Sequence, residues 1–250
     1  MSDFLLNAGR QTLMLELQEA SRLPERLGED FVRAANTIIQ CEGKVVVSGI
    51  GKSGHIGKKI AATLASTGTP AFFVHPAEAL HGDLGMIESR DVMLFISYSG
   101  SAKELDLIIP RLQEKSVALL AMTGKSRSPL ALAAKATLDI SVEREACPMH
   151  LAPTSSTVNT LMMGDALAMA VMQARGFNEE DFARSHPAGA LGPRLLNTVH
   201  PLMRTDEALP QVKPNTRVLD ALLELSRPGP GLVELCDEPR SGQGLFTVGH

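Results

Sequence analysis

Short apolar runs rich in β-branched residues alternate along this chain with segments whose apolar residues recur at helical spacing. Such runs are typical of strands that are buried on both faces, as in parallel sheets. They lie at residues 44–50, 71–74, 92–97, 117–122 and 138–142. Helical patterns separate most of them, at residues 56–66, 105–114 and 129–135. The alternation predicts an α/β fold, a three-layer αβα sandwich around a five-stranded parallel sheet.

The flanking segments predict helices and a separate tail. Apolar residues at helical spacing indicate one helix over about residues 5–27 and another through 31–39, and a long helix is expected over 155–175. The tail offers one helix, 217–225, and one strand, 232–235, which cannot bury a core alone. We therefore expect three parts: N-terminal helices packed on the central domain, the central α/β domain, and a tail, at residues 1–43, 44–196 and 202–250.

Composition narrows the possible functions. The chain has 250 residues, of which 44% are hydrophobic and 21% charged, as in an ordinary globular protein. Its net charge of −4 disfavours a general nucleic-acid binder, so an anionic substrate must be held by a local site. Three cysteines, no signal peptide and no apolar run of membrane length favour a cytoplasmic protein without a membrane partner.

The loop after the first predicted strand, residues 48–55 (SGIGKSGH), opens directly into a predicted helix. Glycines let the backbone approach an anion, and a helix N-terminus presents unpaired N–H groups and partial positive charge. Lys52 adds a full charge, and Ser48 and Ser53 add hydroxyls. The spacing is not that of a nucleotide P-loop. The loop is either a tight turn that needs glycine or, as we favour, a phosphate site.

A second polar loop, residues 97–104 (SYSGSAKE), follows the third predicted strand. Hydroxyls of Ser97 and Ser99 can cradle phosphate oxygens beside the first loop, with Glu104 at the start of the next helix, where the helix dipole stabilises a carboxylate. Alternatively, Ser99 or Ser101 caps that helix and Glu104 completes a capping box. The capping interpretation accounts for one serine and one glutamate but not for the whole cluster.

A third anion-ready loop follows the fifth predicted strand, where residues 154–157 (TSST) open the long helix. The candidate contacts are Thr154, Ser155 and Ser156. The alternative is that Thr154 or Ser155 serves only as an N-cap. Upstream, Cys147 and His150 resemble a metal pair, but no second pair follows, so we do not favour a metal site.

Histidines and acids are dense at residues 75–83 (HPAEALHGD), between the second and third predicted strands. They could bind a metal or move protons, or the segment is a surface loop with incidental charge. Taken together, the three hydroxyl-rich loops suit a phosphate-anchored polyol. The chain lacks the GxSxG of a nucleophile elbow.

Three long motifs resemble a known family. They are VVVSGIGKSGHIGKKIAATLASTGTPAFFVHPAEALHGDLG, EACPMHLAPTSSTVNTLMMGDALAMA and FARSHPAGALG, within residues 40–195. The chain is similar to the sugar isomerase (SIS) family, and within it to the bacterial arabinose-5-phosphate isomerases, in particular the type associated with glucitol utilisation. The resemblance implies the SIS fold, interconversion of D-arabinose 5-phosphate and D-ribulose 5-phosphate, and a homotetramer in which neighbouring subunits complete each site.

The resemblance also implies roles for individual residues. Catalytic positions of the family fall on Lys52, Glu104, Glu145 and His186, with His81 close by. Substrate contacts fall on Gly68, Thr69, His75 and His81, with further contacts in the stretch after Glu104 and near residues 141–143. No cofactor is implied, and zinc at the His75 position is expected to inhibit. We expect Glu104 or a histidine to move the C2 proton, Lys52 to stabilise the enediolate or the phosphate, and His186 to help open the ring.

The chain departs from the family pattern at two places. Ala102 stands where the second loop commonly has a last hydroxyl, so one phosphate contact is missing or replaced. Relatives also carry paired CBS repeats, whereas residues 202–250 resemble only a fragment of the first repeat, through DALLELSRPGPGLVELCD. Three alternatives stay open: a non-catalytic phosphosugar-binding module, an isomerase of another phosphosugar, and an inactive remnant. The two helices before residue 44 show no basic recognition face, which disfavours a DNA-binding sensor.

Overall fold

The computed structural model describes residues 1–186, 210–225, 232–236 and 244–247. The chain divides into two compact units, Met1–Gly192 and Pro193–His250. The expected boundary between residues 196 and 202 lies outside the described residues. Within the described part of the chain, no helix combines the length and the apolar character needed to cross a membrane.

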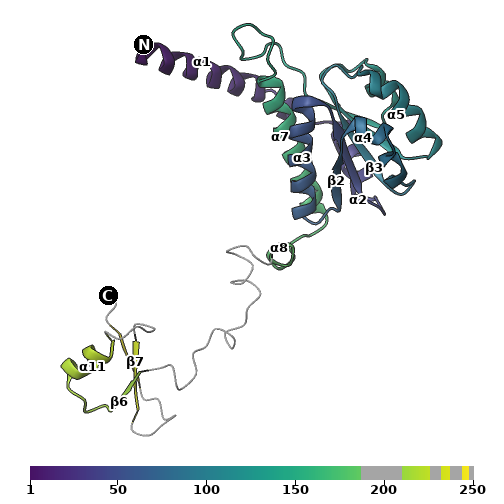
Figure 1. Cartoon of the computed structure of the whole chain (residues 1–250). Coiled ribbons are helices and arrows are strands. Elements are labelled where there is room, and N and C mark those ends of the chain that lie inside the picture. The colour runs from purple at the N-terminus through teal and green to yellow at the C-terminus, as the bar shows by residue number, and fades with distance from the viewer. Residues whose placement is uncertain (187–209, 226–231, 237–243, 248–250) are drawn as a thin grey trace. The chain divides into compact units, whose positions relative to one another are not determined.

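The first unit is built on one parallel sheet (Figure 1). Its strands are β1 (Val45–Gly49), β2 (Ala71–Val74), β3 (Val92–Ile96), β4 (Ala118–Thr123) and β5 (Ala136–Asp139). They lie in the order β2-β1-β3-β4-β5, and every neighbouring pair is parallel. The predicted five-stranded parallel sheet is confirmed. All five carboxyl ends therefore lie at one edge, where parallel α/β sheets bind ligands.

Helices cover both faces of the sheet. The elements are α1 (Ser2–Ala20), η1 (Pro24–Arg26), α2 (Glu29–Ile39), α3 (Gly51–Ser66), α4 (Pro76–Leu80), η2 (Asp83–Met86), α5 (Lys103–Glu114), α6 (Pro129–Ala133), α7 (Ser155–Ala174) and α8 (Glu179–Ser185). Successive strand residues point to opposite faces. Val47 packs in one core with Ile60 of α3 and Leu167 of α7, whereas Val46 packs in the other core with Ile108 of α5. These two cores give the three-layer sandwich.

Three local expectations from the sequence are wrong. The first helix ends at Ala20, because Pro24 cannot continue it and begins a 3₁₀ turn instead. The fifth strand ends at Asp139 rather than at residue 142, since the Asp139 carboxylate accepts the Ser141 N–H and turns the chain. The histidine-rich segment is not only a loop: it contains the short helix α4, which His75 caps.

The second unit contains a small sheet and a helix. Strand β6 (Gln211–Val212) pairs parallel with β7 (Leu232–Leu235), which pairs antiparallel with β8 (Gly244–Thr247). Helix α11 spans Val218–Leu225. The predicted helix and the strand over 232–235 are confirmed, whereas β6 and β8 were not expected. The unit thus has more hydrogen-bonded structure than the apolar pattern indicates.

Two glycines allow α3 to begin directly over the end of β1. A Cβ on Gly54 would lie 2.5 Å from the carbonyl oxygen of Gly49, and a Cβ on Gly49 would lie 2.9 Å from the carbonyl oxygen of Ile96. Both neighbours are backbone oxygens, which cannot move aside as the end of a flexible side chain can. A methyl group at either glycine therefore requires the helix to move. Gly51, with φ of +58°, adopts the left-handed conformation that glycine tolerates best.

We expect Gly54→Ala to destabilise the first unit by about 1–3 kcal/mol, since the added methyl overpacks the junction between helix and strand. Urea unfolding measures the difference. Gly9→Ala is the matched control: nothing lies within 4 Å of its Cβ position on α1, so the variant should gain roughly 0.5–1 kcal/mol from helix propensity. Equal effects of the two substitutions would contradict the close approach at Gly54.

Candidate functional site

Lys52 and Ser53 stand on the first turn of α3, at the carboxyl edge of the sheet. Lys52 is exposed and Ser53 is half-buried, so both side chains are available to a ligand. The helix N-terminus adds unpaired N–H groups and partial positive charge at the same place. Ser48 lies within β1 with 1% of its surface exposed, and its hydroxyl forms no hydrogen bond within the described residues. Ser48 therefore lies beneath the loop rather than on it.

A cleft of about 750 Å³ opens beside this turn. The turn of α3 forms one wall, and the segment after β5 together with the first turns of α7 forms the other. Its polar lining includes Lys52, Ser53, Arg144, Glu145, His150 and Ser156. The volume is ordinary for a small-molecule site. Two cations and several hydroxyls in such a cleft suit a phosphorylated polyol.

Glu145 caps the N-terminus of α7 from the opposite wall. Its Oε2 accepts hydrogen bonds from the Thr154 N–H (2.7 Å), the Ser156 N–H (3.2 Å) and the Thr154 hydroxyl (3.0 Å). The Thr154 hydroxyl accepts in turn from the Ala146 N–H at 2.8 Å. Thr154 thus occupies the N-cap position without using its own hydroxyl as the cap. A carboxylate supplied by the preceding loop takes that role.

The hydrogen bonds at α7 favour an ionised Glu145. Partial burial, the largest single influence, raises the pKa of this carboxyl, but the hydrogen bonds donated by Ser156 and Thr154 together lower it below the ordinary value of 4.5. Ser155 is fully buried, and its hydroxyl forms no hydrogen bond within the described residues. Of the three predicted contacts on this loop, Ser156 lines the cleft, while Thr154 and Ser155 lie outside its lining.

The loop after β3 is tied mainly to itself. The Ser97 hydroxyl accepts the Gly100 N–H at 3.1 Å, and the Ser99 hydroxyl accepts the Ser101 N–H at 3.4 Å. The N-cap of α5 is Ala102, which has no side-chain cap, so the capping-box alternative is wrong. Glu104 is half-buried on the first turn of α5, at the same sheet edge as the cleft but outside its lining.

His75 and His81 flank α4 at the carboxyl end of β2. Both are exposed, and His75 Nδ1 accepts the Ala77 N–H at 3.2 Å as the N-cap of the helix. Within the described residues, no group of three or more His, Cys, Asp and Glu side chains lies close enough to hold a metal ion. Within the described residues, His75 therefore has at most one other such side chain close enough to share a metal ion.

Three predicted site residues lie at the other edge of the sheet. Gly68 and Thr69 precede the first residues of β2, and a Cβ on Gly68 would meet the ring of Phe177, which follows α7. His186 ends α8, with its ring stacked on Phe182 at 4.0 Å between centroids. Helix α7 has 20 residues and is thus about 30 Å long. One chain therefore cannot bring these residues to Lys52.

Three residues of the cleft were given no role in it from the sequence: Tyr98, Arg144 and His150. Tyr98 is the one tyrosine in the chain and lies two positions after β3, a signal that could have singled it out. The other two belong to the segment between β5 and α7, whose path depends on tertiary contacts that no local pattern reveals.

Comparison with known proteins supplies the context for this cleft. The SIS domain family matches residues 38–170. The chain is 85% identical over 249 residues to the arabinose 5-phosphate isomerase GutQ of Escherichia coli K12, covering all of this chain and 78% of that protein. It is 53% identical over 247 residues to the arabinose 5-phosphate isomerase KdsD of Pseudomonas aeruginosa, covering 99% of this chain and 76% of that protein.

A solved structure shows the same architecture. It is that of c3406 from E. coli CFT073, in complex with arabinose 5-phosphate, with a TM-score of 0.72 and 37% sequence identity. The match covers 75% of this chain and all of that one. A protein with this fold and with more than a third of its residues identical therefore holds an aldose phosphate.

We expect Glu145→Gln to lower the unfolding free energy by about 1 kcal/mol at pH 7, a typical value for a lost helix cap. The folded-state pKa of Glu145 is lowered, so its contribution to stability is present above pH 4.5 and is lost as the pH falls through the folded-state pKa. Urea unfolding at neutral and acid pH should show the difference from wild type shrinking in acid.

Glu25→Gln is the control for the loss of one carboxylate, because Glu25 is exposed and forms no hydrogen bond or ion pair within the described residues. If Glu145→Gln lowered the unfolding free energy by the same amount at both pH values, the ionised cap would be contradicted.

Proposed function

We propose that this chain, which belongs to the SIS domain family and within it to the arabinose 5-phosphate isomerases, interconverts D-arabinose 5-phosphate and D-ribulose 5-phosphate. The family identification made from the sequence is confirmed. The observation that carries the proposal is one cleft in which Lys52 and the α3 terminus face the capped terminus of α7. Such a cleft offers positive charge for a phosphate and hydroxyls for a polyol.

The reaction moves protons and leaves the carbon skeleton intact. A base removes the proton from C2 of the open-chain aldose and the carbonyl oxygen gains a proton, which gives a cis-enediol. Return of a proton to C1, with loss of the proton from the C2 hydroxyl, then gives the ketose. No electrons leave the sugar, so the route needs no redox cofactor. Lys52 stabilises the negative charge that develops on the enediolate oxygen or holds the phosphate.

The base is a group whose lone pairs are not already committed. Glu145 accepts three hydrogen bonds through Oε2 in its ionised form, and its lowered pKa makes it a weak base at neutral pH. We assign it to holding the N-terminus of α7. Glu104, at the same sheet edge, is our candidate for the proton transfer, and a histidine is the alternative. His150 lines the cleft and is a candidate in addition to His81.

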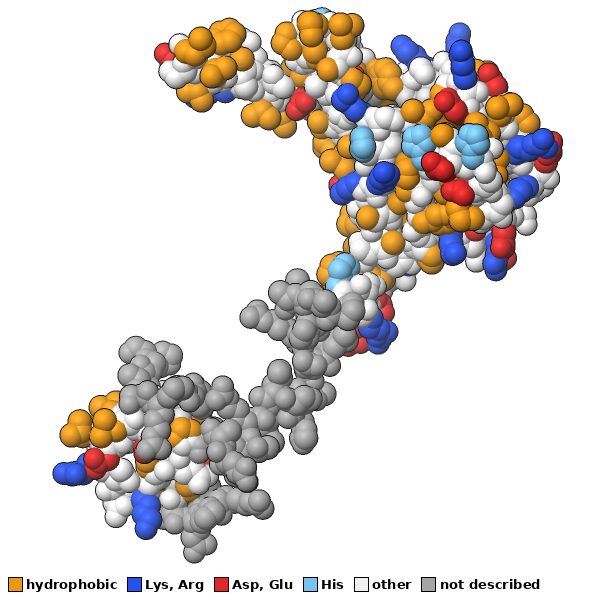
Figure 2. Space-filling model, viewed as in Figure 1, with side chains coloured by type: hydrophobic (Ala, Val, Ile, Leu, Met, Phe, Trp, Pro, Cys, Tyr) orange, Lys and Arg blue, Asp and Glu red, His pale blue; other side chains and the backbone are white. Residues whose placement is uncertain are grey.

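We propose that two copies of the chain build each site within a homotetramer. His186, Gly68 and Thr69 lie at the opposite sheet edge from Lys52, so they reach a site with Lys52 only from a neighbouring copy. An apolar surface suited to association is present. Phe4 and Leu17 on α1 are 69% exposed, and apolar side chains gather on this helix (Figure 2). A groove of about 480 Å³ runs between α1 and α7.

We further propose that residues 202–250 form a CBS-like tail. Supporting this, the second unit has its own sheet, β6-β7-β8, together with α11. The curated relatives GutQ and KdsD extend beyond the length that this chain matches. Zinc inhibition through His75 stays an expectation, because the described residues of one chain provide no complete set of ligands around it.

The first test is incubation of the purified chain with D-arabinose 5-phosphate in D₂O, followed by NMR. We expect ribulose 5-phosphate that carries deuterium at C1, since the C2 proton exchanges on the base before its return. Glu104→Gln should still bind the sugar, with turnover lowered ~100-fold or more. No product from the wild-type chain would overturn the proposed function, and a near-normal Glu104→Gln enzyme would remove Glu104 from the role of base.

Sites shared between subunits are tested by co-expression of Lys52→Ala and His186→Ala chains that carry different tags. Each variant alone should be inactive. In a mixed pair, one site receives Lys52 from one chain and His186 from the other, so random pairing should restore about a quarter of the wild-type activity. If both residues serve a site within one chain, every site in the mixture lacks one of them, and activity would stay at the level of the single variants.

A further inference from the structure

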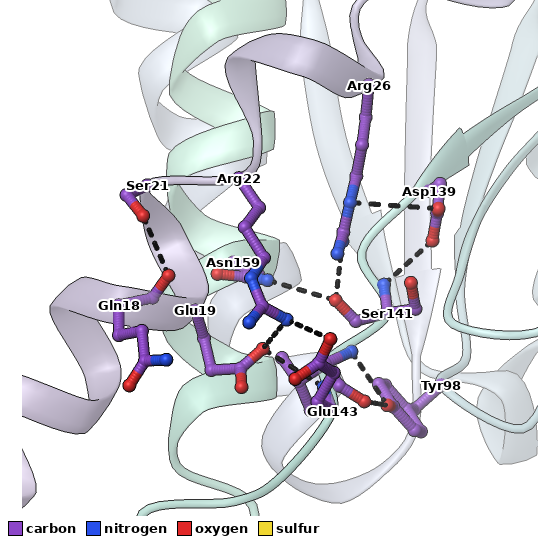
Figure 3. A network of polar contacts seen from close by, with 11 residues as sticks. Gln18, Glu19, Ser21, Arg22, Arg26, Tyr98, Asp139, Ser141, Glu143 and Asn159 are labelled. Carbon is purple, nitrogen blue, oxygen red and sulfur yellow. Dashed lines mark hydrogen bonds and ion pairs between the residues drawn. The ribbon is translucent and has the colours of Figure 1, made fainter.

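The backbone of residues 141–143, which leads into the cleft wall, is held by side chains from other parts of the chain (Figure 3). The Ser141 carbonyl oxygen accepts hydrogen bonds from Asn159 Nδ2 on α7, at 3.2 Å, and from Arg26 Nη1 on η1. The Val142 N–H donates to the Tyr98 hydroxyl at 3.1 Å. The segment has no regular secondary structure, so these bonds replace a ladder or a helix in fixing its path.

Glu19 provides the next anchor along the segment. The N–H of Glu143 donates to Glu19 Oε2 at 3.0 Å, across 124 positions of sequence. Arg22 lies between the two glutamates, with Nη1 2.6 Å from Glu143 Oε1 and 3.8 Å from Glu19 Oε2 (Figure 3). Glu19 in the last turn of α1 thus holds the backbone of Glu143, and Arg22, just after α1, contacts its side chain.

The burial of Glu19 makes this contact unusual. Glu19 is 1% exposed, although most of α1 is exposed. A buried carboxylate is costly to desolvate and is poor evidence for stability, since an apolar residue commonly fills such a place as well or better. What an apolar residue cannot do is accept the Glu143 N–H. The distinctive contribution of Glu19 is therefore that it fixes the position of the segment 141–145.

We propose that Glu19 is a positioning residue for the cleft: with Arg22, it fixes the backbone at Glu143 so that Arg144 and Glu145 face the ligand. Glu19 does not line the cleft and acts through the segment. Arg144 forms no hydrogen bond or ion pair within the described residues, and it stands between two anchored neighbours. The segment thus presents a free cation to the cleft. This inference rests on the proposed isomerase function.

The test compares Glu19→Ala, Glu19→Gln and the control Glu25→Ala in the full chain. Hydrogen–deuterium exchange over residues 141–147 reports the anchor without any ligand. Steady-state kinetics with D-arabinose 5-phosphate report the cleft. A merely structural loss lowers the amount of folded enzyme and hence the apparent kcat, but it does not move KM.

We expect Glu19→Ala to exchange the Glu143 amide at least tenfold faster than wild type and to raise KM about tenfold, with a fall in kcat of similar size. Glu19→Gln should stay within about threefold of wild type in both measurements, because the amide oxygen can accept the same N–H. Glu25→Ala should match wild type. If Glu19→Ala does not fold, Glu19→Asp decides, since its shorter side chain cannot reach Glu143 unless the backbone moves.

The inference is overturned if Glu19→Ala changes neither the exchange over residues 141–147 nor KM, even if its melting temperature falls. Where Glu19→Ala does not fold, the same outcome in Glu19→Asp overturns it. Failure of Glu19→Gln to restore KM would also overturn it. If the wild-type chain does not isomerise the sugar, the proposed function fails on its own, and the exchange experiment alone then supports or overturns the anchoring role of Glu19.

Discussion

The candidate site depends above all on the packing of α3 against α7. A Cβ on Gly164 of α7 would lie 2.4 Å from Cδ1 of Ile60 on α3, so the absence of a side chain at Gly164 sets how closely the helices approach. Both helices begin at the carboxyl edge of the sheet, at Gly51 and Ser155. Their N-termini therefore lie at one cleft.

At this shared edge both helices present N-terminal N–H groups that need hydrogen-bond acceptors. The chain meets this need differently at the two helices. Glu145 uses up N–H groups at the start of α7 with a partly buried, ionised carboxylate, whereas no side chain caps α3 at Ile50. The free donors of α3, together with Lys52, are thus left for an external anion. In the proposed function, this asymmetry gives the cleft an anion-binding end at α3 and an already satisfied wall at α7.

The sheet and the loops at its carboxyl edge could be predicted from the sequence, because buried parallel strands leave continuous apolar runs and the turn between β1 and α3 demands glycine. Lys52, Ser53, Glu145 and Ser156 line one cleft. The resemblance points to residues 141–143 and to Glu145, but the path of the segment 141–145 could not be predicted. Its path is set by bonds to Glu19, Tyr98 and Asn159, whose distance along the chain hides the contact from any local pattern.

Part of the expected site is not assembled within one chain, and the reason is the length of a helix. The length of α7 fixes His186 near one sheet edge and Ser156 at the other, and no rearrangement of loops spans a helix of 20 residues. If, as we propose, a second chain supplies the missing groups, α1 has two roles: its exposed apolar face is available to a neighbouring copy, and Glu19 at its end holds the cleft wall. Contacts that fix α1 would then also fix the segment that carries Arg144 and Glu145, which links the association of chains to the geometry of the site.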